Sequence, residues 1–287
     1  MTTPAIQWYP GHIAKAEKAL REQLKLVDVV LEVRDARIPL ATHHPQVKEW
    51  VGSKMRVLVL NRVDMIQPQA QRMWTQWFRD QGEEPYFTNA QKGEGVIAIA
   101  KAAQAAGVAV NQKRRDRGML PRPVRAVVIG FPNVGKSALI NRLLRRKVVE
   151  SAARPGVTRQ LRWVRISDQL ELLDAPGVIP AKLNDQQAAF KLAICDDIGD
   201  ASYDNQRVAA ALVDLLKFLT ATAPELLPED PLQQRYKIDP ALFTGEAYIY
   251  TLAHQRYQGD VERTARSLLT DFRKGALGRI CLELPPD

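Results

Sequence analysis

Residues 130–137 read Gly-Phe-Pro-Asn-Val-Gly-Lys-Ser and match the G-x-x-x-x-G-K-[ST] pattern of a phosphate-binding loop. They follow the β-branched run Val124–Ile129 and precede a predicted helix, which is the strand–loop–helix context that this pattern requires. Backbone N–H groups from Val134 to Ser137 are expected to surround a β-phosphate, with Lys136 bridging β- and γ-oxygens. The Ser137 hydroxyl is expected to bind Mg²⁺. The alternative is a glycine-rich turn that holds no ligand.

Two further segments could complete a nucleoside triphosphate site. Residues 174–177 (Asp-Ala-Pro-Gly) follow an apolar run, so the Asp174 carboxylate could join the Mg²⁺ ligands at a strand end. The Gly177 N–H could meet a γ-phosphate because no side chain is in the way. Thr158 ends a loop broken by proline and glycine, which could close over the γ-phosphate with the Thr158 hydroxyl on Mg²⁺. An ordinary surface turn is the alternative for Thr158.

The tetrapeptide Asn61-Arg62-Val63-Asp64 follows another predicted strand, at the edge where ligands of open α/β sheets bind. The Asp64 carboxylate could accept two hydrogen bonds from guanine, whereas adenine offers no such pair of donors. An ATPase or a small-molecule kinase is therefore disfavoured. Downstream, Asn89-Ala90 follows a short strand and could present the Ala90 N–H to guanine O6. Taken singly, each short motif is also compatible with a surface turn.

The elements that must position these residues alternate between strands and helices through the first 180 residues. The predicted strands are Val27–Val33, Arg56–Leu60, Tyr86–Thr88, Val124–Ile129, Leu161–Ile166 and Leu170–Leu173. The predicted helices among them are Gln69–Gln81, Val96–Ala106 and Ser137–Leu144. Beyond Pro180 only helices are predicted, at Gln186–Ile198, Gln206–Leu219, Gly245–Tyr257 and Val261–Arg273. The pattern indicates an α/β domain over residues 1–180, with a mostly parallel sheet, and an all-helical domain over residues 181–287.

The composition constrains the class of protein and its partners. The chain has 287 residues with 46% hydrophobic and 25% charged residues, which is typical of a globular protein of about two domains. Its net charge of +9 favours polyphosphate, nucleic acid or an anionic membrane as partner. Two cysteines, Cys195 and Cys281, argue against a disulfide-built secreted scaffold. With neither a leader pattern nor a long apolar run, we predict a cytoplasmic protein.

Basic residues gather in two segments. The connector at 112–125 contains Lys113, Arg114, Arg115, Arg117, Arg122 and Arg125. It is either a solvated linker or a contact for a phosphate backbone. The last predicted helix, with Asp260 as N-cap and Gly275 as C-cap, has an apolar face. Its basic residues, expected to be free to meet RNA phosphates unless they form only a solvated face, are Arg263, Arg266, Arg273, Lys274 and Arg279.

Together these motifs resemble those of translation-factor-type GTPases, but in an unusual order. The guanine-reading segments precede the phosphate loop, so the chain resembles a circularly permuted GTPase. Three more segments narrow the resemblance, which covers nearly the whole chain, to the ribosome biogenesis GTPase A family. They are residues 8–12 (Trp-Tyr-Pro-Gly-His), 35–39 (Asp-Ala-Arg-Ile-Pro) and 275–279 (Gly-Ala-Leu-Gly-Arg). The chain departs from the family at Arg62, where Lys is usual, and at Asn89-Ala90-Gln91, where Ser-Ala-Lys is common.

The resemblance implies a permuted P-loop GTPase domain with a mostly parallel six-stranded sheet, followed by a helical RNA-binding domain. It implies binding of GTP and GDP with Mg²⁺, activation by K⁺, and work on late maturation of the large ribosomal subunit and its RNA, with no membrane partner. The expected GTP-binding residues are Asn61, Arg62, Val63, Asp64, Asn89, Ala90, Asn133, Val134, Gly135, Lys136, Ser137, Ala138 and Gly177. The expected Mg²⁺ ligands are Ser137, Thr158 and Asp174, and Asn133 is the candidate for K⁺.

The residue that orients the attacking water is left open. Many GTPases have a glutamine directly after the D-x-x-G motif, but this chain has Val178, which can neither donate nor accept a hydrogen bond. By resemblance, His12 is a catalytic candidate together with Lys136 and Gly177, although His12 could equally contact RNA. An internal arginine finger from Arg154 or Arg159 is a further possibility. An alternative function is a nucleotide-gated RNA-binding module in which hydrolysis is incidental.

Overall fold

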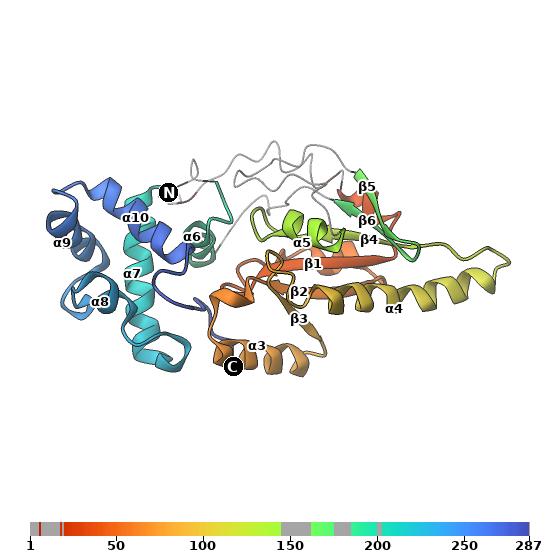
Figure 1. The fold of residues 1–287 in the computed structure, drawn as a ribbon, viewed down its shortest axis with the longest axis horizontal. Helices are drawn as coiled ribbons and strands as arrows, with labels where there is room; N and C mark the ends of the chain where they lie inside the picture. Colours follow the sequence, from red (N-terminus) through yellow and green to blue (C-terminus); the bar gives the residue numbers. More distant parts are fainter. Residues whose placement is uncertain are drawn as a thin grey trace.

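The computed structural model describes residues 6, 18, 20–144, 162–174, 185–199 and 203–286, with the side chains of residues 162–164 and 174 left out. The predicted domain boundary at residue 180 lies outside the described residues, so it stays a prediction. In Figure 1 a sheet flanked by helices occupies one half of the molecule and helices alone form the other.

Six strands form one sheet in the order β3-β2-β1-β4-β6-β5. Their bounds are β1 (Val29–Asp35), β2 (Met55–Asn61), β3 (Pro85–Thr88), β4 (Val124–Ile129), β5 (Arg162–Ser167) and β6 (Leu170–Asp174). Only β5 is antiparallel to its neighbour, and every other described pair is parallel. The prediction of a mostly parallel six-stranded sheet is confirmed. Because the parallel strands share one direction, their carboxyl ends meet at one edge, where the predicted site segments lie.

The strand order agrees with a permuted topology. The phosphate loop follows β4, which is fourth in the sequence but lies in the middle of the sheet. The predicted guanine-reading segments follow β2 and β3, which come earlier in the chain and lie on the far side of β1. Sequence order and spatial order therefore differ, as the resemblance implies.

Helices cover both faces of the sheet. They are α2 (Val47–Val51), α3 (Pro68–Asp80), α4 (Val96–Arg115) and α5 (Lys136–Leu143), with the short 3₁₀ helix η1 (Val63–Met65). Side chains of α4 and α5, such as Ile99 and Leu139, join β1 residues in one buried cluster. On the other face Trp50 of α2 packs with Val30, and Trp74 of α3 packs in its own cluster. The tryptophans on this face therefore have a structural role in the core.

The predicted helix at residues 96–106 is too short, because α4 continues to Arg115. The apolar periodicity of α4 ends at about Ala106, because the second half of the helix is mostly exposed. Gly107 lies inside the helix because it packs closely on β4. A Cβ added there would come within 1.8 Å of the Val124 Cγ2 atom. The connector at 112–125 is thus partly helical.

The helical half contains five α-helices within the described residues. They are α6 (Gln186–Cys195), α7 (Asn205–Thr222), α8 (Pro231–Tyr236), α9 (Gly245–Arg256) and α10 (Val261–Arg273), with the 3₁₀ turns η3 (Pro224–Leu226) and η4 (Pro240–Leu242). Asp260 caps α10 as predicted, because its carboxylate accepts from Arg263 N at 2.9 Å. Gly275 follows the helix with a φ of 76°, the left-handed conformation expected of a C-terminal glycine. Among the described residues no helix is long and apolar enough to cross a membrane.

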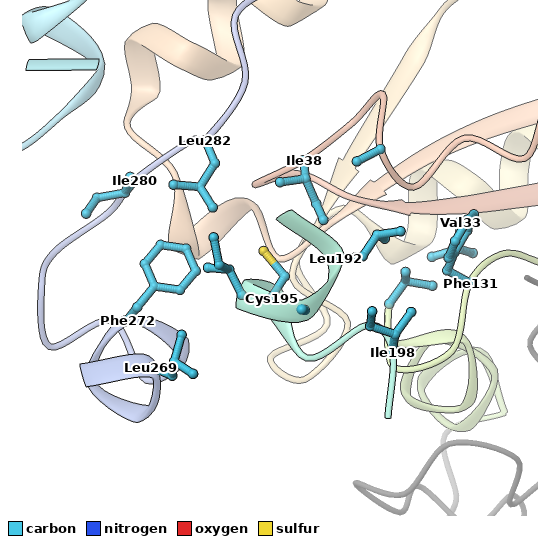
Figure 2. Packing of buried hydrophobic residues seen from close by; sticks show 14 of the residues in the cluster. Val33, Ile38, Phe131, Leu192, Cys195, Ile198, Leu269, Phe272, Ile280 and Leu282 are labelled. Atoms are coloured by element: carbon cyan, nitrogen blue, oxygen red, sulfur yellow. The ribbon is translucent and has the colours of Figure 1, made fainter. Parts of the chain in front are cut away.

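The two halves are joined by α6 and by the C-terminal segment. Apolar side chains of α6 lie between those of α10 and those of β1 and the phosphate loop (Figure 2). Beyond α10 the chain returns to the sheet half, where Ile280 N donates to Met65 O and Leu282 N donates to Arg37 O, both at 2.8 Å. The helical half is therefore attached close to the edge that carries the predicted site.

Candidate functional site

The loop between β4 and α5 has the backbone geometry of a tight phosphate-binding turn. Its φ angles are 149° at Gly130, 57° at Asn133 and 100° at Gly135. A Cβ on Gly130 would lie 2.2 Å from Val33 O, and a Cβ on Gly135 would lie 2.1 Å from Asn61 Nδ2. Both positions require glycine because neighbouring strand ends press on the loop.

The first turn of α5 follows the loop directly. Lys136 is buried, and its ammonium donates to the Phe131 carbonyl at 2.7 Å. Ser137 and Ala138 lie in this first turn, where backbone N–H groups lack a carbonyl acceptor within the helix. Such a helix N-terminus attracts anions, because the free N–H groups and the helix dipole both favour negative charge.

Asn61, the last residue of β2, joins three of the predicted segments. Its buried side chain donates from Nδ2 to Val134 O at 2.8 Å. Its Oδ1 accepts from Ala90 N at 3.0 Å and from the Thr88 hydroxyl at 3.2 Å. One amide thus holds the phosphate loop and the ends of β2 and β3 together. In this structure the Ala90 N–H is bonded to Asn61, and its contact with guanine O6 stays a prediction.

Arg62 adds a second link between the predicted guanine-reading segment and the phosphate loop. Its Nη2 donates to Asn133 O at 2.6 Å, and its Nε lies 3.5 Å from Asp35 Oδ2. Val63 and Asp64 follow in η1, and both are partly exposed. The Asp64 side chain is therefore accessible at the same sheet edge as the loop.

Asn89 is buried at the end of β3. Its Oδ1 accepts from Lys92 N at 3.1 Å, and its backbone N–H donates to Glu94 O at 3.2 Å. Within the described part of the chain its Nδ2 has no hydrogen-bond partner. These bonds fix the turn that presents Ala90.

Asp174 ends β6, and its backbone is in register with Val128 of β4. This register puts Asp174 beside the strand that leads into the phosphate loop. A carboxylate here and the Ser137 hydroxyl are oxygen ligands of the kind that Mg²⁺ prefers, so the residue types fit that ion. The predicted site residues His12, Thr158 and Gly177 lie outside the described residues.

Asn133, the candidate for K⁺, makes a contact that the sequence did not predict. Its Nδ2 donates to the Asp196 carbonyl at 2.6 Å, just beyond the end of α6. The sequence reasoning also missed a role for Asp35 and Arg37, a fully buried ion pair at the end of β1 with a 2.7 Å Nη2–Oδ2 distance. Burial alone would raise the pKa of the Asp35 carboxyl, but the charges of Arg37 and Arg62 outweigh it and hold that pKa below its usual range. The signal available was an Asp-Ala-Arg segment at a strand end.

Solved structures share this fold. The structure of GNP-bound YlqF from T. maritima matches with a TM-score of 0.66 and 23% sequence identity, covering 95% of this chain and 99% of that one. The GDP-bound structure of TM YlqF also matches, with a TM-score of 0.66 and 23% sequence identity, covering 94% of this chain and 100% of that one.

A family model and several similar proteins also match this chain. Residues 125–229 match the family model described as 50S ribosome-binding GTPase. Ribosome biogenesis GTPase A of Priestia megaterium is 39% identical over 98% of both chains. The Bacillus cereus protein of the same name is 35% identical over 98% of this chain and 95% of its own length. These full-length similarities, together with the phosphate loop and the permuted strand order, show that the chain belongs to the ribosome biogenesis GTPase A family.

Proposed function

We propose that this chain binds GTP, hydrolyses it to GDP and phosphate, and assists late assembly of the large ribosomal subunit. The observation that carries the nucleotide part is the set of three hydrogen bonds from Asn61. They hold the phosphate loop and both guanine-reading segments at one sheet edge, so a single bound nucleotide would contact all of them. Membership of a GTPase family supports hydrolysis, and the names of the relatives support ribosome assembly.

The phosphates would bind the loop from Asn133 to Ala138, and the base would bind beside Asp64 and Ala90. Lys136, which now donates to Phe131 O, would turn to the β- and γ-phosphates. Mg²⁺ would be held by Ser137, with Asp174 and Thr158, and would neutralise charge on the phosphate oxygens. Gly177 would donate its N–H to the γ-phosphate.

The attacking water needs a positioning group other than Val178. His12 is our candidate, because an imidazole can accept the proton of a water near neutral pH. Asn133 would contribute to K⁺ binding through its amide oxygen, since the amide nitrogen is already bonded to Asp196 O. Stimulation by K⁺ and by the large subunit belongs to the same proposal.

The helical half would contact ribosomal RNA through exposed basic residues of α10 and its C-terminal side. Arg263, Arg266, Lys274 and Arg279 are exposed there. The expectation that Arg273 is free for phosphates is wrong. Its guanidinium donates to Ala193 O at 2.8 Å and to Ile194 O at 3.0 Å, because it closes the end of α6. The cytoplasmic location stays a prediction.

The Asp64→Asn variant tests the nucleotide specificity. Asparagine keeps the size of the side chain but replaces one acceptor oxygen with a donor, so the pair of bonds to guanine is lost. Xanthine carries an oxygen where guanine carries its amino group and should restore the match. We expect GTP affinity to fall by about 10²-fold or more and XTP affinity to rise, measured by calorimetric titration with Mg²⁺. Stronger binding of ATP than GTP by the wild type would contradict the proposal.

A further inference from the structure

The C-terminal end of α6 is held by side chains from three other parts of the molecule. The last carbonyl groups of α6 have no N–H donor within the helix, as at every helix C-terminus. Arg273 of α10 donates to Ala193 O and Ile194 O. Arg37 donates to Cys195 O at 3.0 Å. Basic side chains are also favoured here because a helix C-terminus carries a partial negative charge.

The fourth carbonyl at this end, that of Asp196, accepts from Asn133 of the phosphate loop at 2.6 Å. Asp196 has a φ of 65°, and its N–H donates to Ala193 O. The position of the Asp196 carbonyl therefore depends on an intact last turn of α6. Arg273 completes that turn from the helical half of the molecule.

A closed series of polar contacts connects the same residues through the sheet half. Asn133 O accepts from Arg62, Arg62 lies beside Asp35, and Asp35 is paired with Arg37. Arg37 then returns to α6 through Cys195 O, and its guanidinium lies 5.5 Å from the centre of the Phe272 ring of α10. Every step joins residues that are buried or partly buried, so a displacement of α6 must disturb the phosphate loop.

Apolar side chains also pack α6 against α10 and the phosphate loop. Figure 2 shows Leu192 and Cys195 between Phe272 on one side and Phe131 of the phosphate loop on the other. The neighbouring Asp197 carboxyl is fully buried, and neither of its oxygens has a hydrogen-bond partner among the residues that the structure describes. Because apolar side chains enclose α6 on both sides, a shift of α6 requires these side chains to repack.

We propose that Arg273 is a positioning residue for nucleotide binding. By completing the end of α6 it keeps the Asp196 carbonyl in place for Asn133, which in turn holds the phosphate loop in its left-handed turn. This inference rests on the proposed function, because it requires that the phosphate loop binds a nucleotide. It follows by linkage that a ligand which moves α10 changes nucleotide affinity, and that a nucleotide changes the affinity for that ligand by the same factor.

Arg273→Gln tests the proposal, with Arg235→Gln as the matched control. Both substitutions remove one positive charge and hydrogen bonds to another helix, but Arg235 of α8 donates to Asp271 of α10, whereas Arg273 donates to the end of α6. GDP affinity is measured by calorimetry after circular dichroism and thermal melting establish that each variant is folded. We expect GDP to bind Arg273→Gln about fivefold or more weakly than the wild type. The control should stay within about twofold. A folded Arg273→Gln variant with unchanged GDP affinity would overturn the proposal.

Asn133→Gly removes the same contact from the loop side, and glycine suits the φ of 57° at this position. In the double variant Arg273→Gln/Asn133→Gly, GDP should bind no more weakly than in Asn133→Gly alone, because one contact cannot be lost twice. Additive losses would contradict the proposal. If Arg273→Gln does not fold, hydrogen exchange of the backbone amides tests the proposal instead. GDP should then slow exchange at residues 194–197 in the wild type but not in Asn133→Gly. Absence of GDP binding by the wild type would instead refute the proposed function.

Discussion

At the scale of single residues, His44 shows how burial beside the phosphate loop changes the chemistry of a side chain. Its ring centre lies 4.2 Å from that of Trp50 and 6.5 Å from that of Phe131. Burial, aided by the charge of His43, lowers the pKa of the His44 imidazole to about 4. With this pKa the ring is neutral at physiological pH, and it packs against Trp50 and Phe131.

The lowered pKa predicts a dependence of stability on pH. An unfolded histidine takes up its proton near pH 6.5, whereas folded His44 does so only near pH 4. Between these values the unfolded state binds more protons, so the free energy of unfolding decreases as the pH falls from 6.5 to 4, by up to about 3 kcal/mol. Denaturant titrations should show a flatter profile in this window for His44→Leu. The exposed His254→Leu should keep the wild-type slope, and an unchanged slope in His44→Leu would contradict this account.

At the scale of elements, most strands and helices could be predicted from periodicity alone. The strand β4 and the helix α10 have the predicted bounds, because a β-branched run and a helix cap are local signals. The long reach of α4 was missed, since its exposed half has no apolar pattern. Partners far apart in sequence were also unpredictable. Nothing local indicates that Asn61 reaches Val134, or that Asn133 reaches Asp196.

Gly135→Ala tests the packing of β2 on the phosphate loop. A Cβ at Gly135 would lie 2.1 Å from Asn61 Nδ2, whereas Gly118 also has a positive φ but nothing within 4 Å. Both alanines carry similar backbone strain of about 1 to 3 kcal/mol, but only the first displaces Asn61. We expect Gly135→Ala to weaken GTP binding by about tenfold or more and Gly118→Ala to leave it unchanged. Equal affinities of the two variants, measured by calorimetry, would show that the contact is unimportant.

At the scale of the whole molecule, the net charge is +9, and the basic side chains are of two kinds. Some form contacts within the fold, and others are exposed. In the connector, Arg122 pairs with Asp28 at 2.7 Å and Arg114 donates to Leu120 O at 3.0 Å. These two cations fix the turn after α4. Lys113, Arg115 and Arg117 are exposed at the end of α4, which projects from the side of the sheet away from the helical half (Figure 1).

A triple variant, Lys113→Ala/Arg115→Ala/Arg117→Ala, tests whether this end contacts RNA. If each cation neutralises a phosphate, the plot of log affinity for ribosomal RNA against log salt should become shallower in the variant. The magnitude of its negative slope should decrease by about 2 to 3. The melting temperature should not change because all three side chains are exposed. Arg122→Ala is the structural control, which should lower the melting temperature with little effect on the salt slope. A triple variant with the wild-type slope would identify the connector as a solvated linker.

We propose that GTP hydrolysis by this chain serves assembly of the large ribosomal subunit. The most direct measurement is the GTP turnover rate with and without purified large-subunit precursors, in K⁺ and in Na⁺ at the same ionic strength. We predict slow turnover by the protein alone and a marked increase on adding precursors in K⁺. Equal rates with and without precursors in both salts would contradict the claim and favour a nucleotide-gated RNA-binding module in which hydrolysis is incidental.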